Sequence, residues 1–137
     1  MQLMNDRTKT FLANSGLLLL RLVFGGILVS VHGWDKLIHF GQMAGNFPNP
    51  IGLGSHWSLA LVTFAEFFCG IAVVLGFATR LAAFPLIVSM SVAVFFQHAH
   101  DPFKIKELAV LYLGAFVIVF LLGAGRFSLD AILFKRR

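Results

Sequence analysis

Long apolar runs separated by short polar segments dominate the chain, and four of them are long enough to cross a lipid bilayer. They cover residues 11–34, 57–78, 81–97 and 108–124. A transmembrane helix needs about 20 mostly apolar residues, because it rises about 1.5 Å per residue and the hydrocarbon core is about 30 Å thick. The runs lack the alternation of apolar and polar residues that marks the strands of a membrane barrel. The pattern therefore predicts an all-α integral membrane protein with four transmembrane helices.

The connections between the runs predict how the helices are arranged. The segment from Gly76 to Arg80 is so short that the second and third helices must be antiparallel neighbours. A longer segment, residues 35–56, contains prolines and glycines that prevent a continuous helix, and its apolar residues indicate that it lies at the membrane interface. We therefore expect a single domain over residues 1–137, an antiparallel four-helix bundle with an external loop at 35–56 and a tail at 125–137.

The first apolar run has a second interpretation, as a cleaved signal peptide. Arg7 and Lys9 would supply the basic start of such a peptide. However, Arg21 interrupts the run, and no small-residue cleavage pattern follows it. We therefore expect the run to be retained as a transmembrane helix.

The composition excludes several classes of protein. Hydrophobic residues make up 58% of the chain and charged residues only 12%, whereas soluble proteins carry roughly 25% charged residues. This excludes a soluble enzyme, a disordered tail and a nucleic-acid-binding protein, and it makes the lipid bilayer the main partner. The one cysteine, Cys69, excludes an internal disulfide, a CxxC redox pair and a cysteine-built zinc site. An oligomer is compatible with the sequence.

The positions of lysine and arginine predict the orientation in the membrane, because short loops that carry them stay preferentially on the cytoplasmic side. With four transmembrane helices, most of these residues fall on the side of the two termini: Arg7, Lys9, Arg80, Arg126, Lys135, Arg136 and Arg137. The few lysines on the opposite side are partly offset by nearby carboxylates. We therefore expect both termini on the cytoplasmic side.

Two charged side chains lie inside the predicted helices, Arg21 in the first and Glu66 in the second. A charge within a membrane costs about 2.5–3.5 kcal/mol on insertion scales, so it normally faces the protein interior and finds a partner. The depths of the two residues differ by about 6 Å at about 1.5 Å per residue, so we expect an Arg21–Glu66 ion pair between the first two helices. The pair would either fix how these helices dock or belong to a site in which Glu66 exchanges a proton or binds a head group. Alternatively, Arg21 reaches the cytoplasmic interface and leaves Glu66 protonated and alone.

All five histidines fall on the external side of the predicted topology: His32, His39, His56, His98 and His100. Imidazoles there can be simple interfacial groups, move protons, hydrogen-bond a quinone carbonyl, or bind a metal ion or haem. His32, His98 and His100 are weak metal candidates, because no HExxH or other zinc signature is present and Cys69 lies too deep to join them. We therefore expect neither a metal site nor haem.

Glu107 opens the fourth predicted helix, where a carboxylate complements the positive end of the helix dipole. The topology also places it at the level of Lys36, so we expect a Lys36–Glu107 contact. Tyr112 is another polar group near this level. The candidate residues of a polar pocket on the external side are therefore Arg21, His32, Lys36, Glu66, Glu107 and Tyr112.

Four motifs, in order along the chain, are similar to those of the DoxX family of small bacterial membrane proteins. The first is the run from Arg21 to Lys36, with its arginine, its paired glycines and its ending HGWDKL at residues 32–37. The others are Glu66 with Gly70 and the turn at 75–80 (LGFATR), Lys106-Glu107, and residues 123–130 (GAGRFSLD). The resemblance implies a four-helix protein of the bacterial inner membrane, associated with a terminal quinol oxidase, a thiosulfate:quinone oxidoreductase, or thiol and oxidative-stress systems. Carried over by position, the family's polar residues are Arg21, His32, Lys36, Glu66, Arg80 and Glu107. The lack of cysteine pairs means that thiol exchange would need a sulfur atom from a partner.

These observations favour a membrane subunit or partner of a quinone-linked or oxidative-stress redox system, whose pocket binds a quinone or another amphipathic ligand. We expect an accessory subunit rather than an enzyme, and no residue is assigned a catalytic role. The alternative is a non-catalytic scaffold or assembly factor in which Arg21 and Glu66 are structural. Small-molecule transport would need a continuous polar path, which the uncharged third and fourth helices do not provide in a monomer.

Overall fold

The computed structural model describes residues 4–135, and within that range every regular element is a helix. The described chain contains four helices that are long and apolar enough to span a membrane: Asp6–Ile38, Ser55–Leu75, Thr79–Gln97 and Phe103–Leu122. We call them the first to fourth spanning helices. They confirm the prediction of a helical membrane protein with four apolar helices.

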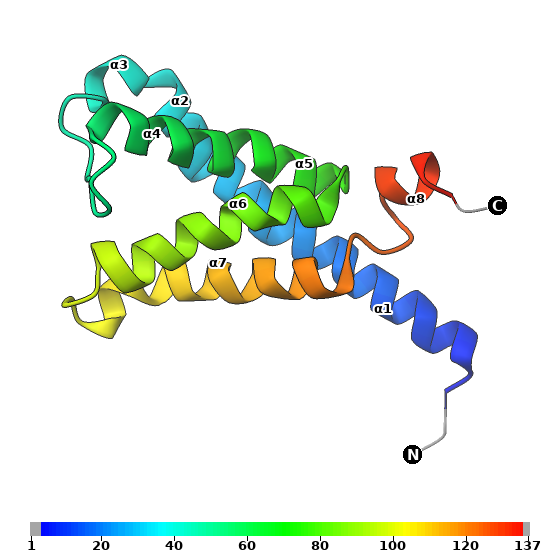
Figure 1. The fold of residues 1–137 in the computed structure, drawn as a ribbon. Coiled ribbons are helices and arrows are strands. Elements are labelled where there is room, and N and C mark those ends of the chain that lie inside the picture. The colour runs from blue at the N-terminus through cyan, green and yellow to red at the C-terminus, as the bar shows by residue number, and fades with distance from the viewer. Residues whose placement is uncertain (1–3, 136–137) are drawn as a thin grey trace.

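Three of the spanning helices combine α-helical and π-helical segments, and Figure 1 shows their arrangement. The first contains α1 (Asp6–Leu20), η1 (Arg21–Gly25), η2 (Leu28–Gly33) and α2 (Trp34–Ile38), and the short α3 (Phe40–Met43) follows it. The second contains α4 (Ser55–Thr63), η3 (Phe64–Cys69) and α5 (Gly70–Leu75). The third contains α6 (Thr79–Val92) and η4 (Ala93–Gln97), the fourth is α7 (Phe103–Leu122), and α8 (Leu129–Leu133) follows.

The first spanning helix is longer than the apolar run at 11–34 from which it was predicted. It begins at Asp6, because the Asn5 side chain accepts a hydrogen bond from the backbone N–H of Arg7 and so caps the helix. No residue of α1 is buried, and Figure 1 shows α1 extending past the end of α7, on the side where both termini lie. The close packing of this helix therefore begins at Arg21, in η1.

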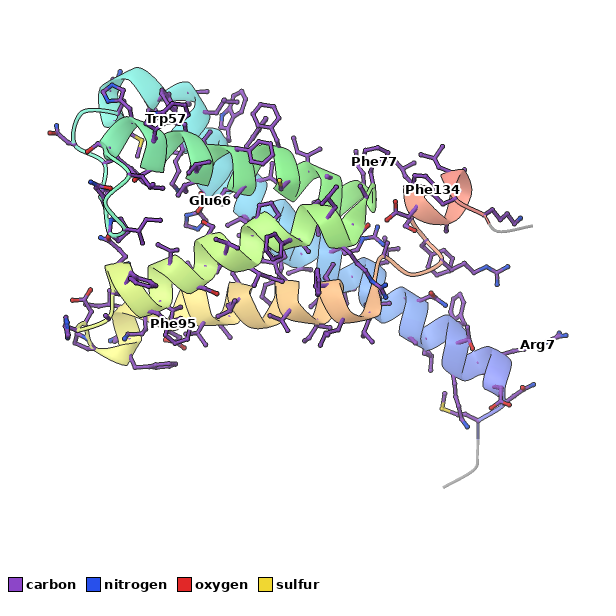
Figure 2. The ribbon with its side chains drawn as sticks, viewed as in Figure 1. Arg7, Trp57, Glu66, Phe77, Phe95 and Phe134 are labelled. Atoms are coloured by element: carbon purple, nitrogen blue, oxygen red, sulfur yellow. The ribbon has the colours of Figure 1, made fainter. Side chains whose placement is uncertain are left out.

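The interior of the bundle is formed by apolar residues from all four spanning helices, among them Leu28, Val73, Leu86 and Phe116, which are at most 1% exposed. The outer surface is apolar too, as expected of helices that face lipid. Figure 2 shows this for Trp57, Phe77 and Phe95, whose side chains lie on the outside. The first two spanning helices approach closely at Gly33, where a Cβ atom would lie only 2.8 Å from the backbone carbonyl carbon of Glu66.

The bundle end that carries both termini is held together partly by α8, through its residue Asp130. The Asp130 carboxylate accepts hydrogen bonds from the backbone N–H groups of Ala78 and Thr79 at 2.7 and 2.9 Å, and from the Thr79 hydroxyl at 2.7 Å. It thereby caps the N-terminus of α6. Gly76, with φ of +71°, forms the tight turn between the second and third spanning helices, a conformation that glycine adopts at no steric cost.

Candidate functional site

Arg21 is buried at the bundle end that carries both termini and is only 1% exposed. Its guanidinium donates hydrogen bonds to the carbonyl oxygens of Val73 and Val74, near the end of α5, at 3.0 and 3.1 Å. It also donates to the carbonyl oxygens of Ala124 and Phe127, in the segment between α7 and α8. The Val73 carbonyl oxygen also accepts a hydrogen bond from the Gly76 N–H at 3.1 Å. Arg21 thus joins three parts of the fold: its own helix, the end of α5, and the segment between α7 and α8.

The predicted Arg21–Glu66 ion pair is wrong. The prediction placed the two residues at similar depth, but the backbone of Glu66 lies against Gly33 of the first spanning helix. Gly33 is about three turns of helix, or about 18 Å, from Arg21. The depth estimate failed because it took the ends of the first two helices to be level. Gly33, which lies against Glu66, is only five residues from the end of its helix at Ile38, whereas Glu66 is eleven residues from the start of its helix at Ser55.

Glu66 is paired with Lys36 instead. The Lys36 Nζ atom lies 2.6 Å from Oε2 of Glu66, and the two side chains are only 15% and 9% exposed. Lys36 extends from α2 and Glu66 from η3, so the pair joins the first two spanning helices. The predicted Lys36–Glu107 contact is also wrong, because Glu66 occupies the Lys36 ammonium while Glu107 is exposed.

A cavity of about 660 Å³ lies beside the Lys36–Glu66 pair. This volume is within the roughly 300–1,000 Å³ that is usual for small-molecule sites. The polar side chains that line it are His32, Lys36, Ser58, Glu66, Ser89, Gln97, His98 and Tyr112, and most of the remaining lining is apolar. The pocket thus brings together the predicted site residues His32, Lys36, Glu66 and Tyr112, whereas Arg21 and Glu107 do not line it.

Three of the π-helical segments border this cavity. They contribute Leu28 and His32 from η2, Phe64, Ala65 and Glu66 from η3, and Ala93 and Gln97 from η4. A π-helical turn displaces side chains from the regular helical spacing, and such turns occur frequently at functional sites. The irregular backbone is therefore concentrated where the polar groups of three helices converge.

The ring of Tyr112 is held in place by three neighbouring rings. It stacks on Phe116 with the ring centroids 6.1 Å apart, and the rings of His32 and Phe24 meet it edge-on at 6.0 Å. Both geometries are favourable for aromatic pairs. Since Tyr112 also lines the cavity, its hydroxyl is a positioned hydrogen-bond donor in the cavity wall.

The segment between α3 and α4 covers one side of the cavity with Phe47, Pro48, Pro50, Ile51 and Leu53. Asn49 fastens this segment to α4, because its side-chain oxygen accepts hydrogen bonds from the Gly54 N–H at 2.9 Å and the Ser58 hydroxyl at 3.3 Å. The sequence predicted these residues at the membrane interface but did not indicate that they line the pocket. The signal available in the sequence was the presence of Phe47 and Ile51 beside prolines in an otherwise polar and glycine-rich segment.

The histidines lie in separate places. His32 and His98 both line the cavity, but His98 is paired with Asp101, with Nδ1 2.7 Å from Oδ2. His39 is paired with Asp35 at 2.9 Å, one turn away on the first helix and its extension. Among residues 4–135, no group of three or more histidine, cysteine, aspartate or glutamate side chains is arranged to hold a metal ion.

The fold and the cavity define a helical membrane protein with an internal pocket between its spanning helices. The sequence profile of the DoxX family matches residues 16–99, which include the Lys36–Glu66 pair. The match covers more than half of the chain, so the protein belongs to the DoxX family, and the resemblance found in the sequence motifs is confirmed. No curated protein and no solved structure gives a significant match.

Proposed function

We propose that the protein is a membrane subunit or partner of a quinone-linked redox system and that its pocket binds the head group of a membrane quinone. The observation that carries this proposal is the position of the Lys36–Glu66 pair and the Tyr112 hydroxyl in the wall of a largely apolar cavity of about 660 Å³. A quinone ring is apolar apart from its carbonyl oxygens, which accept hydrogen bonds. The pocket offers such a ring apolar walls and a small number of donors, as ligand sites commonly do.

The charge balance of the pocket favours an uncharged head group. Lys36 and Glu66 neutralise each other, so a charged head group would have to disrupt a 2.6 Å pair and leave one buried charge without its partner. The Lys36 ammonium has three N–H donors and uses one on Glu66, so another is available for a quinone carbonyl. Tyr112 supplies a second donor from a different helix.

The depth of the pair also favours a quinone over a phospholipid. Glu66 lies about 16 Å along the second spanning helix from its start at Ser55, so the pair lies within a membrane-spanning segment and not in the loop beyond it. A phospholipid head group stays at the membrane surface because moving its charges to this depth is costly. An uncharged quinone ring carries no such penalty.

We place this protein, as part of the same proposal, in the bacterial inner membrane as a single antiparallel four-helix domain with both termini cytoplasmic. The family supports the compartment, and the excess of lysine and arginine on the side of the termini supports the orientation. The residues of this chain bind and orient the quinone, and a partner enzyme exchanges electrons with it.

Replacing Tyr112 with phenylalanine tests the proposal, because it removes only the hydroxyl. A net hydrogen bond is worth about 0.5–1.5 kcal/mol, so Tyr112→Phe should weaken quinone binding by about two- to tenfold. The measurement is isothermal titration calorimetry of the detergent-solubilised protein with a quinone that carries one isoprenoid unit. Both a benzoquinone and a naphthoquinone head should be used.

The matched control is Ser30→Ala, which also removes one hydroxyl from a spanning helix. The Ser30 hydroxyl bonds the Gly26 carbonyl oxygen at 2.7 Å and does not line the pocket, so this variant should bind as the wild type does. If the wild-type protein shows no saturable binding of either quinone, the proposal fails. The scaffold or assembly factor would then be the better description of the protein.

A further inference from the structure

The second and third spanning helices are close together at one end and separate towards the other. α6 packs against α5 and η3 but hardly against α4, and Figure 1 shows α4 and α6 diverging towards the end where the segment between α3 and α4 lies. The cavity lies in this region, because its lining includes residues of both α4 and α6. The divergence therefore produces a wedge between two membrane-spanning helices.

The rim of this wedge belongs to the cavity and to the outer surface at once. Leu61 and Phe64 from the second spanning helix, and Phe84 and Val88 from the third, line the cavity, yet they are between 46% and 56% exposed. A residue that lines a closed cavity would be buried. Since these residues lie within apolar helices, the surface to which they are exposed is the one that faces lipid.

The side of the cavity next to the loop is covered, in contrast. Phe47 and Pro50, which are half-buried, lie over it, and Asn49 ties the segment that carries them to the start of α4. The Lys36–Glu66 pair and the buried Tyr112 lie on the first, second and fourth spanning helices. The exposed rim residues on α4, η3 and α6 are all apolar. The cavity thus has a polar interior, a covered loop side and an apolar opening towards lipid.

We propose that the pocket opens sideways into the bilayer between α4 and α6, and that the isoprenoid tail of the bound quinone leaves through this opening. This inference rests on the proposed function, and it adds the route of access and the residues that select the tail. The head group enters from lipid and reaches Lys36 and Tyr112, while Leu61 and Val88 contact the tail. Long-tailed quinones then bind without leaving the hydrocarbon layer.

The experiment narrows the opening and compares two quinones with the same head group, one with a single isoprenoid unit and one with a long tail. Val88→Trp enlarges the rim on α6, and Leu61→Trp enlarges it on α4. The control is Ile118→Trp on α7, a position that is 44% exposed, close to the 46% of Val88, but does not line the cavity. Binding is measured in lipid nanodiscs, after gel filtration and thermal unfolding have established that each variant is folded.

We expect a rim variant to weaken binding of the long-tailed quinone at least about tenfold and to leave that of the short-tailed one within about threefold. Ile118→Trp should change neither. If Val88→Trp does not fold, Leu61→Trp carries the test. The inference is overturned if folded rim variants bind the long-tailed quinone as tightly as the wild type, or if they lose both quinones equally. A wild-type protein that binds neither quinone refutes the proposed function instead, so the two failures are distinguishable.

Discussion

The two places where charged side chains are buried in this protein differ in how their charges are satisfied. Arg21 donates to four carbonyl oxygens from two separate segments and lies in a closed, packed environment. Lys36 and Glu66 satisfy each other through one 2.6 Å contact and lie beside a cavity of about 660 Å³. The guanidinium of Arg21 uses all its donors on the fold, whereas the ammonium of Lys36 keeps donors beside the cavity.

This difference separates a structural charge from a candidate binding site. A guanidinium whose donors all reach backbone carbonyls has nothing left to offer a ligand, but it connects the segments that supply those carbonyls. An ammonium paired with one carboxylate keeps further donors. We therefore assign Arg21 to the stability of the bundle and the Lys36–Glu66 pair to ligand binding, and three variants test this division.

Truncation of Arg21 should have the largest effect. Arg21→Ala leaves the carbonyl oxygens of Val74, Ala124 and Phe127 without this donor, whereas that of Val73 keeps the Gly76 N–H. Each buried polar group that loses its partner costs about 1–3 kcal/mol. With three such groups, we expect a loss of at least about 3 kcal/mol in the free energy of unfolding, measured as a lower unfolding temperature in detergent. Arg21→Lys should recover only part of it, since an ammonium lacks the planar array of five donors.

The matched control for this prediction is Arg126→Ala, which removes an exposed arginine at the same bundle end. Surface substitutions usually change stability by no more than about 0.5 kcal/mol. If Arg21→Ala unfolds at the temperature of Arg126→Ala, the structural role of Arg21 is refuted. The fraction of Arg21→Ala that folds should bind the short-tailed quinone as the wild type does, because Arg21 does not line the pocket.

The partners of Arg21 show why the sequence predicted the spanning helices correctly but did not predict which groups contact each other. The four spanning helices follow from apolar runs, because a bilayer requires such runs in any helical membrane protein. The sequence also identified Arg21 as a buried charge that needs partners. Those partners are backbone carbonyl groups, which every residue carries, so no residue type in the sequence could indicate them.

The pocket was predictable only in part for a related reason. His32, Lys36, Glu66 and Tyr112 were recognised as polar residues in or near the predicted spans, and all four line the cavity. Their pairing depends on the close contact at Gly33 and on the π-helical segments, which change which side chains meet. These features depend on the tertiary structure, so helix ends and regular spacing gave the wrong partner for Glu66.

Replacement of both charges at the pocket should affect binding but not stability. In Lys36→Met with Glu66→Met, two apolar side chains replace a buried ion pair, an exchange that is often neutral or stabilising. We expect an unfolding temperature equal to or above that of the wild type, together with at least about tenfold weaker quinone binding. Thermal unfolding and calorimetry on the same preparation measure the two quantities.

The single variant Lys36→Met provides the contrast, because it leaves the Glu66 carboxylate buried without its partner. Breaking a buried pair in this way costs about 3–5 kcal/mol, so the single variant should be less stable than the double variant. A double variant that is as unstable as Lys36→Met would show that the pair is needed for folding, as Arg21 is. The division between the two buried charges would then be lost.

The smallest effect is expected at the loop that covers the pocket. This loop lies at the bundle end that contains the cavity, and Arg21 lies at the opposite, packed end. Asn49→Ala removes the acceptor that ties the segment between α3 and α4 to Gly54 and Ser58, whereas Asn46→Ala alters the same exposed segment without removing that tie. Because local opening depends on few contacts, only Asn49→Ala should speed amide hydrogen exchange over residues 47–54, by several-fold, with exchange around Arg21 unchanged. Equal exchange in the two variants would mean that apolar contacts of Phe47 and Ile51, rather than the asparagine, hold the cover in place.

The same variant also tests the route by which the quinone enters. Since the tail of the ligand leaves towards lipid, Asn49→Ala should change quinone binding by less than about threefold. A larger loss would indicate access through the loop instead.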